Sequence, residues 1–140
     1  MQIFNLEKYI DQPVTSMHIG GDWHIATTNQ SSDCDAIAIE IAGEFIAFKH
    51  KPAGENGDII ITPISRDDFR WYDIVVDLSG GIYRLEKIVY EDGYTDMVVF
   101  QSEIDHIHIC SSDHNLIINK SIEDLSGPCY LLDDPSILLA

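Results

Sequence analysis

Short apolar runs separated by turn-forming residues recur along most of this chain. The clearest alternation lies in residues 36–41, where isoleucines at 37, 39 and 41 are interleaved with Ala36, Ala38 and Glu40. Successive side chains of a β-strand point to opposite faces, so this period of two predicts a strand whose isoleucine face lies in the core. The alanine face is thin and would let another part of the molecule approach closely.

Turn chemistry predicts where the strands reverse. Asp92–Gly93 between two β-type runs is the strongest hairpin signal, and Gly20–Asp22 (GGD) predicts a second tight turn. Residues 51–58 (KPAGENGD) have the composition of a loop. Pro63 places its strand at an edge or a bulge, because proline cannot donate to a sheet ladder. Helical spacing occurs only near the start, where we expect a short helix over Asn5–Asp11.

These patterns predict a mainly β protein with a short N-terminal helix. The length of 140 residues is that of one domain, which we assign to residues 1–140. Strands that follow one another through short turns form an antiparallel meander, and either a sandwich or a curved half-barrel would bury the alternating apolar faces. The strand order stays open at this point.

Charge is the unusual feature of the composition. Eight lysines and arginines stand against 24 aspartates and glutamates, which gives a formal net charge of −16. Direct nucleic-acid binding requires a basic footprint, which this chain lacks, and anionic membrane surfaces are disfavoured for the same reason. A strongly negative protein associates rapidly with cationic partners. Acidity that serves solubility alone is the competing interpretation.

The sequence has the pattern of neither a signal peptide nor a membrane span. The N-terminus lacks the basic start and apolar run of a signal peptide, and no stretch reaches the ~20 apolar residues of a membrane span. Cys34, Cys110 and Cys129 are odd in number and form no CxxC pair. We therefore expect reduced thiols and a cytoplasmic location.

A histidine-rich stretch, residues 105–115 (DHIHICSSDHN), is the candidate for metal chemistry. His106, His108 and Cys110 would share one face of a strand, and His114 could fold back over the following turn. Imidazole and thiolate ligands suit zinc. The HxH on a strand resembles the start of a cupin metal site, but the glycine-rich lead and the following glutamate are missing. The favoured alternative is a hairpin arm whose isoleucines face the core and whose histidines lie on a wet or half-buried face.

Motifs of established catalytic machinery are absent from the sequence. It contains no GxSxG, HExxH, Walker loop or dinucleotide fingerprint. Paired carboxylates are numerous, but pairs arise by chance in so acidic a chain. We therefore expect a protein that is not an enzyme and needs no cofactor.

Aromatic residues embedded among acids are the best candidates for a contact surface. Binding hot spots favour tryptophan and tyrosine, and surrounding carboxylates would meet a basic partner. Two stretches combine these residue types, RDDFRWYDIVVD and YEDGYTD. The candidate binding residues are Asp67, Asp68, Trp71, Tyr72, Asp73, Asp77, Tyr90, Glu91, Asp92 and Tyr94.

Two functional hypotheses follow. The first is a non-enzymatic acidic protein that neutralises a basic protein, most simply a bacterial immunity protein or antitoxin that inhibits a nuclease-type toxin. The second is a small metal-dependent β-barrel enzyme of cupin-like type that uses His106 and His108 with His114 or Cys110. The sequence does not define the oligomeric state, and the C-terminal SILLA is expected to be core or strand.

Overall fold

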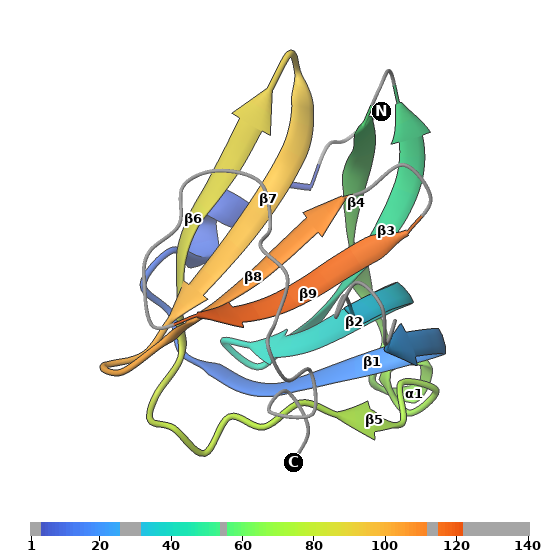
Figure 1. Cartoon of the computed structure of the whole chain (residues 1–140). Helices are drawn as coiled ribbons and strands as arrows, with labels where there is room; N and C mark the ends of the chain where they lie inside the picture. Colours follow the sequence, from blue (N-terminus) through green and yellow to red (C-terminus); the bar gives the residue numbers. More distant parts are fainter. Residues whose placement is uncertain (1–3, 26–31, 54–55, 112–114, 122–140) are drawn as a thin grey trace.

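The structure is a computed structural model that describes residues 4–25, 32–53, 56–111 and 115–121. The predicted fold class is confirmed, because one antiparallel sheet of nine strands curls into a half-barrel (Figure 1). The elements in chain order are a 3-10 turn η1 (Leu6–Tyr9), β1 (Val14–Ile25), β2 (Ser32–Ile41), β3 (Glu44–Ala53), β4 (Asn56–Ile64), the helix α1 (Arg66–Phe69), β5 (Ile74–Val75), β6 (Arg84–Glu91), β7 (Tyr94–Gln101), β8 (His106–Ser111) and β9 (Leu116–Ser121).

The sheet forks at β2. Strand β1 pairs along one edge of β2, while the other edge pairs first with β9 at Asp33–Cys34 and then with β3 over Ala36–Ile41. The main order is β4-β3-β2-β9-β8-β7-β6. Two hairpins, β3–β4 and β6–β7, therefore rise on either side of β8 and β9 (Figure 1). Because β2 pairs with three strands, the sheet is curved and has one concave face.

Hydrogen bonds fasten the free edges of this shell. The Val14 amide donates to the Tyr83 carbonyl at 2.8 Å, which ties the start of β1 to β6. On the other side, the Thr95 amide of β7 donates to Asp58 Oδ1 of β4 at 2.8 Å. Exposed edge strands invite pairing with other chains, and these contacts reduce that exposure.

The concave face holds the main hydrophobic core. It combines the isoleucines of β2, Phe48 of β3, Phe100 of β7, and both Ile107 and Ile109 of β8. The predicted inward orientation of the β2 and β8 isoleucines is thus confirmed. A smaller buried cluster of Met97, Val99 and Cys110 lies on the opposite face of β7 and β8.

Several predicted boundaries need correction. Gly20–Asp22 is no hairpin turn, because β1 runs through it and absorbs the glycines as a bulge, with a register shift between Gly20 and Trp23. Residues 51–58 are mostly strand, since β3 and β4 continue to pair as far as Ala53 and Asn56. By contrast, the turn at Asp92–Gly93 is confirmed, with φ values of 51° and 82°. The expected helix at Asn5–Asp11 is a 3-10 turn capped by the Asn5 side chain.

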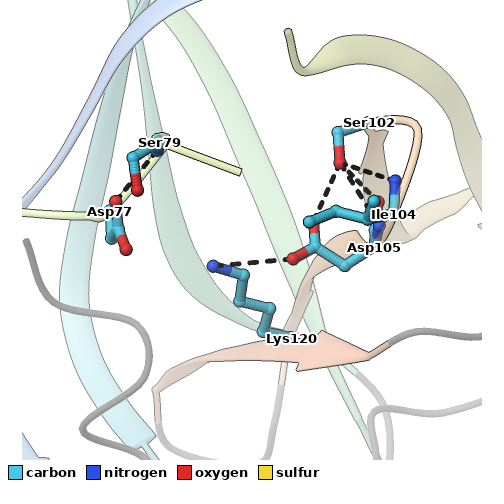
Figure 2. A network of polar contacts seen from close by, with 6 residues as sticks. All are labelled: Asp77, Ser79, Ser102, Ile104, Asp105 and Lys120. Atoms are coloured by element: carbon cyan, nitrogen blue, oxygen red, sulfur yellow. Dashed lines mark hydrogen bonds and ion pairs between the residues drawn. The ribbon is translucent and has the colours of Figure 1, made fainter. Parts of the chain in front are cut away.

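A network of polar contacts links β9 to the turn between β7 and β8 (Figure 2). Lys120 Nζ of β9 lies 3.7 Å from Asp105 Oδ2, and their side chains are only 11% and 12% exposed. Ser102 Oγ donates to the other carboxylate oxygen, Asp105 Oδ1, at 3.0 Å. The same ammonium lies 5.9 Å from the ring centre of Tyr83, which is buried. Burial, followed by the adjacent Asp105 carboxylate, raises the pKa of Tyr83.

We expect Lys120→Met to destabilise the protein by about 3 kcal/mol, because it leaves a nearly buried carboxylate without its cation. Arg70→Met is the matched control, because it removes a cation from a pair with Asp67 whose side chains are 74% and 79% exposed. That change should cost less than about 1 kcal/mol. Urea unfolding of both variants measures the difference. Equal losses would show that the Lys120 pair contributes no more than a surface pair.

Candidate acid–aromatic contact site

The candidate binding residues separate into three places. Residues 66–73, here called the acid–aromatic segment, comprise α1 and the turn that leads to β5. Residues 90–94 form the tip of the β6–β7 hairpin, at the opposite end of the molecule (Figure 1). Asp77 belongs to neither surface. The structure therefore does not bring the ten predicted residues into one site.

Local sequence explains how the acid–aromatic segment begins. Arg66–Phe69 forms a single turn of helix. Ser65 is its N-cap, and its hydroxyl oxygen accepts a hydrogen bond from the Asp68 amide at 3.1 Å. The acids at 67 and 68 occupy the first turn, where the helix dipole favours negative charge.

One ring anchors the segment to the sheet. The Phe69 ring centre lies 4.7 Å from that of His18 on β1 and 4.8 Å from that of Phe45 on β3. Phe69 thus spans the convex face of the sheet. Ala38 and Ala47 are directly paired on this face and are completely buried. The prediction that something approaches the thin alanine face is confirmed, and the approaching group is the acid–aromatic segment.

A second ring uses the space that a glycine leaves. A Cβ atom at Gly20 would lie 2.6 Å from Cδ2 of Tyr72, so only glycine permits this ring to lie against β1. The Tyr72 carbonyl accepts a hydrogen bond from His18 Nδ1 at 2.8 Å. Because the acceptor is a carbonyl, Nδ1 of His18 must carry the proton. Backbone and ring together fix the position of residue 72.

Trp71, between these anchors, points away from the sheet and is 81% exposed. It lines the mouth of a pocket of about 440 Å³ together with Tyr72 and Asp68. The remaining lining residues are Gly20, Gly21, Ala36, Lys49 and Ile64. The sequence reasoning missed these five residues as site residues. The glycine pair and the small side chains of the alanine face were the available signals, because they let another segment approach the sheet closely.

The two neighbouring helix carboxylates differ in their partners. Asp67 forms an ion pair with Arg70 one turn later. Asp68 forms no ion pair with another of the described residues, and it faces the pocket. Partial burial, and then the negative charge of Asp68, raises the pKa of Tyr72. Lys49 is the one cation among the described lining residues. Beside its aromatic rings the segment thus presents a carboxylate that has no ion-pair partner in the part of the chain that the structure describes.

Asp77 lies apart from both places, and its carboxylate has a local hydrogen-bond partner. Its Oδ1 accepts a hydrogen bond from the Ser79 amide at 2.9 Å, within the polar network of Figure 2. Hydrogen bonds from Ser79, followed by the charge of Lys120, lower the pKa of Asp77 below its usual range. The residue is half-buried. Asp77 is therefore separate from the acid–aromatic segment, and its part in binding stays a prediction.

The hairpin tip keeps its predicted exposure. Tyr90 and Tyr94 both have exposed rings on either side of the turn, and Glu91 and Asp92 are exposed between them. Partial burial and a hydrogen bond to Glu7 raise the pKa of Tyr90. The residues of the tip line neither the pocket beside Trp71 nor a second pocket between Gly81 and Glu103.

The histidine stretch is more buried than predicted. His106 is half-buried, with Nε2 3.6 Å from Glu86 Oε2, whereas His108 is 0% exposed. Their ring centres lie 6.0 Å apart. No three metal-ligating side chains come together within the part of the chain that the structure describes, and His114 lies outside that part. Cys110 is disulfide-bonded, which corrects the expectation of a reduced thiol and removes it as a ligand.

Comparison with protein-family models, with curated protein sequences and with solved structures finds no match for this chain. Among the described residues, no helix has both the length and the apolar character needed to cross a membrane. The functional interpretation therefore rests on the geometry described above.

A pair of substitutions on the acid–aromatic segment tests which ring is structural. Trp71→Ala should change the free energy of unfolding by less than about 0.5 kcal/mol, because the side chain faces solvent. Phe69→Ala should destabilise by about 2 kcal/mol, because it removes a ring packed against two others. Thermal or urea unfolding measures both. A large loss in Trp71→Ala would mean that Trp71 belongs to the core and is unavailable for contact.

Proposed function

We propose that this protein is a non-enzymatic acidic binding protein that neutralises a basic protein partner. The specific form we favour is an immunity protein or antitoxin that occupies the phosphate-binding surface of a nuclease-type toxin. One observation carries the proposal: Trp71 is held 81% exposed on an anchored segment, beside a pocket and a carboxylate, Asp68, that forms no ion pair with another described residue.

Leaving an indole in water forgoes a large hydrophobic stabilisation. Aromatic side chains dominate the energetics of protein interfaces, and tryptophan is the residue most enriched at binding hot spots. The neighbouring rings of Phe69 and Tyr72 are packed on the sheet, which fixes the backbone on both sides of Trp71. An anchored, exposed tryptophan loses little conformational freedom when it is buried by a partner, which favours affinity.

Charge supports a basic partner. The chain carries a formal net charge of −16, and its acid–aromatic segment holds Asp67, Asp68 and Asp73 in exposed positions. Such a field accelerates association with a cationic protein and repels anionic ones. Nuclease active sites are basic because they bind phosphates, so an acidic inhibitor can block them directly. No resident cofactor takes part in this proposal, and a cytoplasmic location remains a prediction.

The metal-enzyme hypothesis has no specific observation in its favour. His106 and His108 lie on one strand, but within the described residues no third ligand joins them. The structure leaves His114 undescribed, so this hypothesis stays an alternative that the geometry does not favour.

The proposal predicts salt-sensitive binding to the basic protein encoded by an adjacent gene. The double charge reversal Asp68→Lys and Asp73→Lys should slow association at low salt by at least about tenfold, because steering depends on opposite charge. Stopped-flow association at 20 and 300 mM salt measures this effect. Glu91→Lys with Asp92→Lys at the distant hairpin tip is the matched control, since it shifts the net charge but leaves the segment unchanged.

Two outcomes would contradict the proposal. An association rate that is the same at low and high salt would exclude electrostatic steering. Equal slowing by the two sets of charge reversals would show that only the total charge matters, and that the acid–aromatic segment is not the contact surface.

A further inference from the structure

We propose that the pocket beside Trp71 receives an arginine side chain from the basic partner. This inference rests on the proposed function and adds the chemical group that the pocket recognises. It depends on three features that lie together: an exposed indole, a second ring held against the sheet, and a carboxylate that no described side chain neutralises.

The shape of the pocket suits one long side chain. Its volume of about 440 Å³ lies in the lower part of the range for pockets that bind small molecules, about 300–1,000 Å³. Its lining includes the small residues Gly20, Gly21 and Ala36 and the apolar side chain of Ile64. An arginine stem is apolar for most of its length, so these surfaces can cover it while its head reaches polar groups.

The chemistry of the rim favours a guanidinium over an ammonium. A guanidinium is planar, stacks on aromatic faces and donates two parallel hydrogen bonds to a carboxylate. Trp71 supplies the preferred ring for a cation–π contact, and Asp68 supplies the carboxylate. A lysine would keep only the point charge.

Two arginines of the acid–aromatic segment each make one of these two kinds of contact. Arg66 places its guanidinium carbon 5.6 Å from the ring centre of Phe45, and Arg70 forms an ion pair with Asp67. Both neighbouring arginines are therefore engaged elsewhere. Neither lines the pocket, so neither arginine occupies the Asp68 carboxylate or the Trp71 ring there.

Lys49 places a positive charge in the same pocket and so opposes the binding of an arginine. It is exposed and lines the same space as Asp68, so its charge repels an incoming guanidinium. This repulsion yields a test with a definite sign. Removing the Lys49 charge should strengthen arginine binding, an effect that a purely structural role of the pocket would not produce.

The experiment is an NMR titration of the full chain with the peptide acetyl-Gly-Arg-Gly-amide, followed at the indole N–H of Trp71. Trp71→Phe assigns that signal, because the chain has two tryptophans. We expect a saturable shift with the arginine peptide. The matched peptide with citrulline, a neutral isostere of arginine, should bind at least about threefold more weakly, because it lacks the charge. The lysine peptide should also bind more weakly than the arginine peptide.

Substitutions in and near the pocket identify which side chains bind the arginine peptide. Asp68→Asn should weaken the affinity for the arginine peptide by about threefold to fivefold. Asp67→Asn should leave that affinity unchanged, because Asp67 is already paired with Arg70. Lys49→Gln should tighten binding by about twofold or more. Unfolding curves check that each variant remains folded.

The outcomes separate this inference from the proposed function. No shift at Trp71, equal binding of the arginine, lysine and citrulline peptides, or equal effects of Asp67→Asn and Asp68→Asn would overturn the arginine pocket. If the basic partner binds normally to Trp71→Ala and Asp68→Asn, the pocket assignment fails while the proposed function stands. If the arginine peptide binds as expected but the association rate with the basic partner does not depend on salt, the proposed function fails while the pocket assignment stands.

Discussion

The packing of Phe69 and Tyr72 on a convex face of small side chains is the interaction on which the candidate site depends. Phe69 lies between His18 and Phe45, and Tyr72 lies where Gly20 has no side chain. Larger residues on β1 or β2 would lift the segment from the sheet, because close-packed surfaces accept little added volume. With its neighbours anchored, Trp71 is directed outward. Its exposure is therefore a consequence of how the segment docks.

Acidic residues serve different purposes in different parts of this molecule. Asp105 stabilises one end of the half-barrel through Lys120 and Ser102, and Asp77 belongs to the same network. Asp68 has no such partner among the described residues and faces a pocket. The net charge alone could not separate these roles. A carboxylate is available to a partner only where the fold leaves it without a cation of its own.

Sequence patterns captured the features that depend on local alternation and turn chemistry. The isoleucines of β2 and β8 point into the core, and Asp92–Gly93 forms the expected turn. The patterns failed where pairing between distant strands decides the outcome. Gly20–Gly21 reads locally as a turn, yet its pairing with β2 carries the strand through it. The pocket could not be predicted for the same reason, since its residues come from separate strands and from the helix turn. Burial of His108 also requires contacts that alternation does not encode.

Amide hydrogen exchange of the protein alone and in complex with its basic partner is the most direct test of the central claim, that residues 66–73 carry the contact. Local opening at a surface segment is suppressed when a partner covers it, so exchange slows at the site of contact. The account predicts slower exchange in residues 66–73 on binding, with the tip at residues 90–94 unchanged. Slowing confined to that tip, or to strands remote from Trp71, would contradict it.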